Sequence, residues 1–67
     1  MPIVCNLGRV MADRGVSLND LSRLTGISTT NLSKLKRGHS RAIRFTTLVA
    51  ICEALDCQPG DILEHKR

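Results

Sequence analysis

Aromatic residues are almost absent from this chain, which has one phenylalanine and neither tryptophan nor tyrosine. Its core must therefore be built from leucine, isoleucine and valine. The 67 residues make one small domain, and a domain of this size buries only about 60% of the surface that its unfolded chain exposes. So small an interior leaves little room for a deep substrate pocket, which argues against an enzyme.

The cysteine count argues against a disulfide scaffold. Cys5, Cys52 and Cys57 are an odd number, and the chain shows no signal peptide. With only His39 and His65 to assist them, their spacing matches no zinc pattern, so we expect neither metal nor cofactor. Cys52 falls on an apolar helix face and is expected to be a small core residue. No apolar run approaches the roughly 20 residues that span a bilayer, and we expect a soluble, cytoplasmic protein.

Acidic residues are missing from the middle of the chain. Ten Lys and Arg against six Asp and Glu give a net charge of +4. Five cations fall in one acid-free stretch, namely Lys34, Lys36, Arg37, Arg41 and Arg44. Such a stretch suits a polyanion, either nucleic acid or an anionic membrane surface. A solvated basic face without a partner would have the same composition, so charge alone does not decide.

Glycine and proline divide the chain into short pieces that begin alike. In each, an apolar residue precedes a polar capping residue, and another apolar residue follows four positions after the cap. This is the hydrophobic staple, which fixes the angle at which the chain enters a helix. It predicts helices capped by Asn6, Ser17, Ser28 and Gln58, the last with Pro59 at its first helical position. Gly15 and Gly38 are the expected left-handed ends of the first and third helices.

Apolar residues at helical spacing predict a further helix over residues 45–56, for which Arg44 or Thr46 suits the first half-turn. A short edge strand is expected at Pro2 to Cys5, paired with the tail after Leu63. The predicted fold is therefore an all-α, five-helix domain with a small strand pair. Its expected core comprises Leu7, Val10, Met11, Leu18, Leu21, Leu24, Ile27, Leu32, Leu35, Phe45, Leu48, Ile51, Leu55, Ile62 and Leu63.

The second and third helices are separated by only a few residues around Gly26. Two helices that meet at a tight, glycine-containing turn form a helix-turn-helix, whose second helix enters the DNA major groove. We expect this unit at about residues 17–37. Small Ser22 lets the two helices approach, while Ile27, Leu32 and Leu35 hold the third helix down. The hydroxyl and basic residues of residues 28–37 then face outward.

The stretches SLNDLSRLTGISTTNLSKLKRG and IRFTTLVAICEALDCQPGDIL resemble the Cro/CI-type, Xre-like (lambda-repressor-like) helix-turn-helix repressors of phages and bacteria. The resemblance covers nearly the whole chain and implies a compact five-helix DNA-binding domain. Two departures stand out. Ser22 occupies a position where the family usually has Ala, and Thr29 and Thr30 stand where it often has Gln. The second departure prevents an operator sequence from being carried over.

The resemblance implies base contacts from the amino-terminal part of the third helix, here Thr29, Thr30, Ser33 and Lys34. Hydroxyls donate to or accept from base edges, and lysine prefers O6 and N7 of guanine. Asn31, the one amide nearby, is expected to point sideways toward the body of the protein. Phosphate contacts are implied at helix amino-termini and in the loop after the third helix, from Arg9, Ser17, Asn19, Lys36, Arg37, His39, Ser40, Arg41 and Arg44.

These residues predict a sequence-specific, double-stranded DNA-binding regulator in a bacterium or phage. We expect a repressor, because blocking polymerase needs only occupancy and the chain has no spare domain for recruitment or for a small-molecule effector. A homodimer is expected on a pseudo-palindromic site, with third helices about 34 Å apart. Its subunit contact is placed at the fifth helix and tail, near Cys57, Ile62 and Leu63.

Other functions remain open at this point. The same fold serves protein-interaction modules, such as the antitoxin of a toxin–antitoxin pair. An enzyme would need a nucleophile, base and orienting group, and no Ser-His-Asp or Cys-His set is suggested. RNA binding would lack the aromatic platforms on which single strands stack. A Thr-Thr pair at a helix start is also ordinary capping chemistry, and His39 in a loop is ordinarily just solvated.

Overall fold

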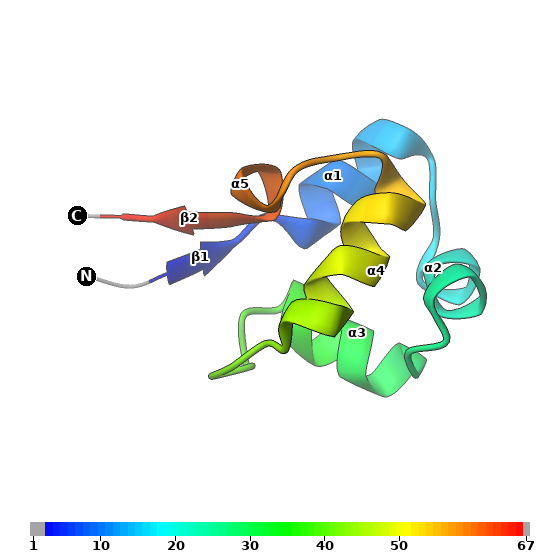
Figure 1. Cartoon of the computed structure of the whole chain (residues 1–67), viewed down its shortest axis with the longest axis horizontal. Helices are drawn as coiled ribbons and strands as arrows, with labels where there is room; N and C mark the ends of the chain where they lie inside the picture. Colours follow the sequence, from blue (N-terminus) through cyan, green and yellow to red (C-terminus); the bar gives the residue numbers. More distant parts are fainter. Residues whose placement is uncertain (1–2, 67) are drawn as a thin grey trace.

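The computed structural model describes residues 3–66, in which five short helices and a two-stranded sheet follow one another (Figure 1). The elements are β1 (Ile3–Cys5), α1 (Leu7–Arg14), α2 (Leu18–Thr25), α3 (Thr29–Lys36), α4 (Phe45–Leu55), α5 (Pro59–Ile62) and β2 (Leu63–His65). The predicted fold class is confirmed. Helix α4 begins at Phe45 as predicted, with Arg44 at the N-cap, and it ends at Leu55, one residue before the predicted end. Pro2, the expected first residue of the strand, lies outside the described residues.

The two ends of the chain are held together by hydrogen bonds. The backbone N–H of Asn6 donates to the carbonyl of Ile62 at 2.6 Å, and the Asn6 amide donates to the Glu64 carboxylate at 3.2 Å. The hydrogen bond from the Asn6 amide lowers the pKa of Glu64, and the neighbouring Lys66 lowers it further. At the start of α5, Asp61 accepts the backbone N–H of Gln58 at 2.8 Å. The start of α1 is thereby tied to the end of α5.

The sheet is an antiparallel pair in which Ile3 lies opposite His65 and Cys5 lies opposite Leu63. Both strands extend from the helices to the same side of the molecule (Figure 1). The predicted pairing of the amino-terminal segment with the tail is thus confirmed. No helix within residues 3–66 has both the length and the apolar character that crossing a bilayer requires.

The end of α4 is fixed by a left-handed residue that is not glycine. Asp56 has φ 51°, and the N–H of Cys57 donates back to the carbonyl of Cys52 at 3.0 Å. This is the longer bond of a Schellman motif. From α1, the Arg14 guanidinium donates to the carbonyls of Leu55 at 2.8 Å and Asp56 at 3.2 Å. A cation at this position also complements the negative end of the helix dipole.

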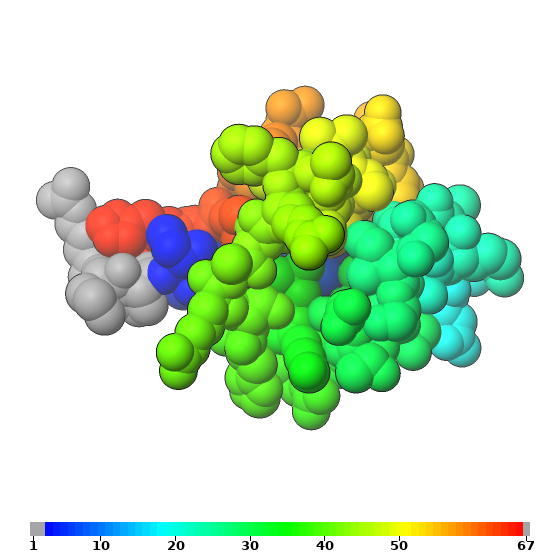
Figure 2. All heavy atoms as spheres, turned by 60° about the horizontal axis from the view of Figure 1, so that its bottom comes forward, coloured from blue at the N-terminus to red at the C-terminus, as the bar shows by residue number. Residues whose placement is uncertain are grey.

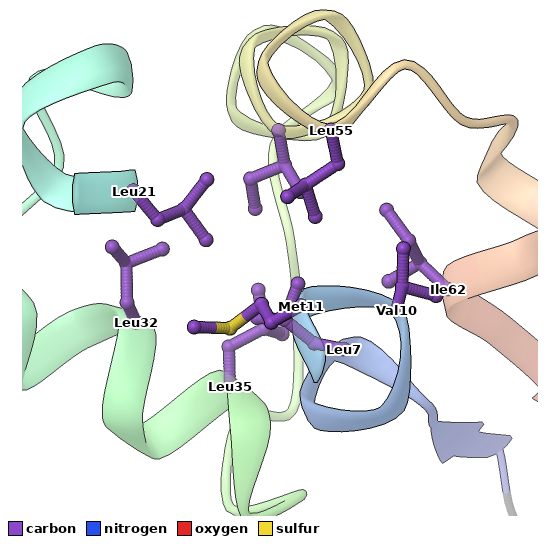
Figure 3. Packing of buried hydrophobic residues seen from close by; sticks show 9 residues of the cluster. Leu7, Val10, Met11, Leu21, Leu32, Leu35, Leu55 and Ile62 are labelled. Atoms are coloured by element: carbon purple, nitrogen blue, oxygen red, sulfur yellow. The ribbon is translucent and has the colours of Figure 1, made fainter. Parts of the chain in front are cut away.

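The core is aliphatic and draws on all five helices (Figure 3). Within residues 3–66, nine hydrophobic residues are buried, and every one was predicted: Leu7, Val10, Met11, Leu21, Leu32, Leu35, Ile51, Leu55 and Ile62. Around them pack the half-buried Leu18, Ile27, Leu48 and Leu63, together with Cys52. Because Ile62 is fully buried, it is not available for the subunit contact that the sequence suggested.

Two predicted core residues lie at the surface instead. Leu24 is 61% exposed and Phe45 is 84% exposed. At about 100° of rotation per helical residue, Phe45 lies roughly 100° from the middle of the face that Ile51 and Leu55 bury. Leu24 lies about 60° from the buried Leu21, on the side away from the half-buried Leu18 and Thr25. Both predictions were wrong because helical spacing alone does not locate the centre of the buried face.

Candidate nucleic-acid interface

Three side-chain hydrogen bonds hold the turn between α2 and α3. The Ser22 hydroxyl donates to the carbonyl of Ile27 at 2.6 Å. The Thr25 hydroxyl donates to the carbonyl of Leu21 at 2.7 Å and accepts the N–H of Ile27 at 3.2 Å. Gly26 makes the reversal, with φ 76°. Ser22 was expected to matter for its small size, but its hydroxyl also ties the turn, a function that alanine cannot serve.

The start of α3 is capped and pinned. The Ser28 hydroxyl accepts the backbone N–H of Asn31 at 3.2 Å, as the sequence predicts for an N-cap. Behind it, Leu32 is fully buried and Leu35 nearly so. The inner face of α3 is therefore fixed against the protein, which leaves the opposite face to solvent.

The end of α3 is a second Schellman motif. The N–H of Gly38 donates to the carbonyl of Leu35 at 3.1 Å, and the N–H of His39 donates to the carbonyl of Lys34 at 2.9 Å. Gly38 has φ 77°, which an L side chain rarely adopts. The predicted glycine end of α3 is confirmed, and it directs residues 37–44, the basic loop, back past α3 toward α4.

Residues predicted to contact bases lie mostly on the free face of α3. Thr29, Thr30 and Lys34 are exposed, whereas Ser33 is half-buried. Asn31 is exposed too and lines a groove between α3 and α4, where Thr47 from the first turn of α4 joins it. Sequence reasoning did not single out Thr47, whose only signal was its place near the start of a helix beside the basic loop.

The residues predicted to contact phosphates fall into separate groups. Ser40 and Arg44 line the same groove as Lys34, at the start of α4. That start has no side-chain cap on its N–H groups. Arg41 instead lines a second groove, between the basic loop and the sheet, which Glu64 also lines.

The remaining predicted contacts are spread more widely. Lys36 lies over α1, where a Cβ added to Gly8 would come within 3.0 Å of the Lys36 side chain. Arg9 lies apart from α3, in a depression that Asp13 and Asp61 also line. Ser17 and Asn19 are exposed at the start of α2, and Arg37 and His39 are exposed after α3.

Cations are concentrated around α3. Within the described residues, the five cations of the acid-free stretch (Lys34, Lys36, Arg37, Arg41 and Arg44) form no ion pair. Arg14 is occupied at the end of α4, and Arg23 pairs with Asp20 at 2.8 Å. Figure 2 shows α3 and the basic loop forming one continuous surface of the molecule. Positive charge on that surface is therefore not neutralised by the protein itself.

One acidic residue lies at the start of the helix-turn-helix. The Ser17 hydroxyl accepts the N–H of Asp20 at 3.1 Å, and the Asp20 carboxylate faces the N–H of Ser17 at 3.5 Å. The two hydrogen bonds form a capping box, and the predicted cap at Ser17 is confirmed. Hydrogen bonds from Ser17 hold the pKa of Asp20 below its ordinary value, and the Arg23 guanidinium lowers it further.

Asp20→Asn should therefore change the acid stability of the protein. A carboxyl whose pKa is lower in the folded state contributes stability above its unfolded pKa of about 4, and this contribution is lost as the pH falls through the folded pKa. The difference in thermal midpoint between wild type and variant should be largest above about pH 5 and should shrink below about pH 4. Thermal unfolding across this range measures it.

Asp13→Asn is the matched control, because Asp13 is exposed and accepts no hydrogen bond within residues 3–66. Its midpoint should follow that of the wild type across the same range. A difference for Asp20→Asn that grows toward acid pH would contradict the capping role of its carboxylate.

A polar helix held outward by a tight turn from the helix before it is the arrangement of helix-turn-helix DNA-binding domains. The comparison with known families agrees. Residues 6–67 match the Cro/C1-type HTH DNA-binding domain, and the chain belongs to this family. It is also similar to YozG of Bacillus subtilis (strain 168), an uncharacterised HTH-type transcriptional regulator. The two are 52% identical over 66 residues, which cover 98% of this chain and 79% of YozG. The resemblance drawn from the sequence is confirmed.

Proposed function

We propose that this protein is a sequence-specific, double-stranded DNA-binding transcriptional regulator that inserts α3 into the major groove. The observation that carries the proposal is the free outer face of α3, which lies beside cations that no described residue neutralises. Base edges would be read by Thr29, Thr30, Ser33 and Lys34. Ser33 is half-buried, so its hydroxyl is the least able of these to reach a base. None of the four is a bidentate reader, and part of the specificity would come from DNA shape.

Phosphate contacts would supply most of the affinity without specifying sequence. We assign them to Ser17, Asn19, Lys36, Arg37, His39, Ser40, Arg41 and Arg44, with Arg9 reaching only the flanking backbone. The groove shared by Lys34, Ser40 and Arg44, beside the uncapped start of α4, supports this assignment. If about five phosphates are neutralised per subunit, log K should fall with log salt at a slope near −4 to −5 for each subunit.

We propose that the protein acts as a repressor and binds as a homodimer. A single domain of this size makes few contacts, whereas two subunits on a pseudo-palindrome place their α3 helices about 34 Å apart, one turn of duplex. Occupancy of such a site is sufficient to block polymerase. The bacterial relative named as a transcriptional regulator supports this function and a place in the bacterial cytoplasm, with the nucleoid.

A protein-interaction module, such as an antitoxin, is the second candidate. The exposed apolar side chains of Phe45 and Val49 on α4 favour it, since exposed apolar surface often marks a protein contact. The two candidates differ in their dependence on the basic surface. A protein partner held by α4 would bind equally well after the charges around α3 are reversed.

Selection of bound fragments from random duplex DNA tests the proposal. We expect enrichment of one motif with two-fold symmetry, and sedimentation should show two protein chains on it. A motif of a single half-site with one bound chain would overturn the homodimer but not DNA recognition. No enrichment, even in dilute salt, would overturn the proposal as a whole.

A further inference from the structure

The turn that ends α4 brings two cysteines together. Asp56 is its left-handed residue, and the N–H of Cys57 donates to the carbonyl of Cys52 at 3.0 Å. In a Schellman motif, the side chains at these two positions commonly pack against each other. Cys52 and Cys57 are five positions apart in sequence, but the backbone hydrogen bond holds them side by side.

Two further observations agree with this placement. Burial raises the pKa of the Cys57 thiol, and the neighbouring Cys52 thiol raises it further. The two sulfurs are therefore close enough to influence each other. Both cysteines are half-buried, and both line the same open groove beside α4. Cys5 lies elsewhere, on β1, and lines a different groove.

We propose that Cys52 and Cys57 form a redox-active dithiol, which a low-molecular-weight disulfide converts to an intrachain disulfide. A disulfide needs Cα atoms about 4.4–6.8 Å apart, a separation that the backbone bond across this turn favours. A metal site is less suited, because no cluster of three or more His, Cys, Asp or Glu able to hold an ion occurs within residues 3–66. The inference is independent of DNA binding.

The reaction proceeds by two thiol–disulfide exchanges. One cysteine thiolate attacks a sulfur of the small disulfide, whose S–S bond breaks, and the released thiolate takes up a proton. The protein then carries a mixed disulfide. The second cysteine thiolate attacks the protein sulfur of that bond and releases a second small thiol. In total, Cys52 and Cys57 lose two protons and two electrons, and the small disulfide is reduced to two thiols.

The consequence is a crosslink across the end of α4. It would close a loop of only six residues, 52–57, around the carbonyls that Arg14 already binds. The loop spans the end of α4, which lies far from α3 and the basic loop (Figure 1). The crosslink should therefore raise the thermal midpoint, by about 9–18 °C for a loop and a domain of this size, and leave DNA affinity unchanged within about twofold.

Oxidised glutathione is the probe, and peptide mass is the readout. Trypsin cuts after Arg44 and after Lys66, so one peptide carries both Cys52 and Cys57 while Cys5 lies in another. In the folded wild-type protein, the peptide of residues 45–66 should become lighter by two hydrogens. Cys52→Ser and Cys57→Ser should each stop at one glutathione adduct on that peptide, and Cys5→Ser should react as the wild type does.

The thermal midpoint is compared before and after oxidation in the Cys5→Ser variant, because this variant cannot form intermolecular disulfides through Cys5. A rise on oxidation, reversed by dithiothreitol, supports the crosslink. The proposal is wrong if the wild-type peptide ends as a glutathione adduct, or if both serine variants oxidise like the wild type.

Discussion

Reversing the charges of Lys34 and Arg37 together to Glu should lower the affinity for operator DNA by about 100-fold or more. Both side chains are exposed on or beside the outer face of α3, and neither has an ion pair within the described residues. Each reversal removes a counterion-releasing contact and adds repulsion from a phosphate. Titration of labelled duplex at several salt concentrations measures the effect. The salt slope should become shallower by about two, since each lost contact contributes about 0.9.

The matched control reverses Arg23 and Lys66 to Glu, which changes the net charge of the protein by the same amount. Arg23 pairs with Asp20 and Lys66 pairs with Glu64, whereas Lys34 and Arg37 have no ion pair within the described residues. If affinity depends on the local position of charge, the control should retain most of the binding. An equal loss in both variants would mean that DNA affinity depends only on the net charge of the protein. It would also mean that α3 does not contact DNA more closely than the rest of the surface does.

The same pair of variants separates the two candidate functions. Neither Lys34 nor Arg37 supports the core, so the double reversal should stay folded, as its thermal midpoint would show. Loss of DNA binding from a folded protein supports the regulator. Retained binding of a protein partner by a variant that no longer binds DNA would support the interaction module instead.

The helices were predictable because their ends are encoded locally. Ser17 and Ser28 cap their helices in the structure as the sequence indicates. These signals depend on neighbours within four residues, so they do not depend on how the rest of the chain packs. The contribution of Ser22 was not predictable in full. Its hydroxyl bonds a carbonyl five residues ahead, across a turn whose shape the sequence does not specify.

The candidate site was predictable as a list of residues but not as an arrangement. Lys34 and Arg44 are ten positions apart, and the reversal at Gly38 brings them to one groove. Arg9, in contrast, was grouped with them by charge and family resemblance, and the packing of α1 against α5 places it beside Asp13 and Asp61. Which cations share a surface is decided by tertiary packing, which spacing along the chain does not report.

Leu21→Ala should lower the free energy of unfolding by about 3 kcal/mol, the usual cost of removing most of a leucine from a packed core. Leu21 is fully buried, and Figure 3 shows its side chain from α2 pointing toward that of Leu32 on α3. A domain this small has a total stability of only several kcal/mol. The variant should therefore unfold at a much lower temperature or urea concentration, which thermal and urea melts followed by circular dichroism would measure.

Leu24→Ala is the matched comparison, because it makes the same substitution on the same helix three residues later. Leu24 is 61% exposed, so its loss should cost less than about 0.5 kcal/mol. Alanine also favours a helix slightly more than leucine does, which further reduces the cost. Similar losses in the two variants would mean that α2 is rotated from its position in the structure. Because α2 holds α3 through Leu21 and Leu32, such a rotation would also move the polar face of α3 that is proposed to enter DNA.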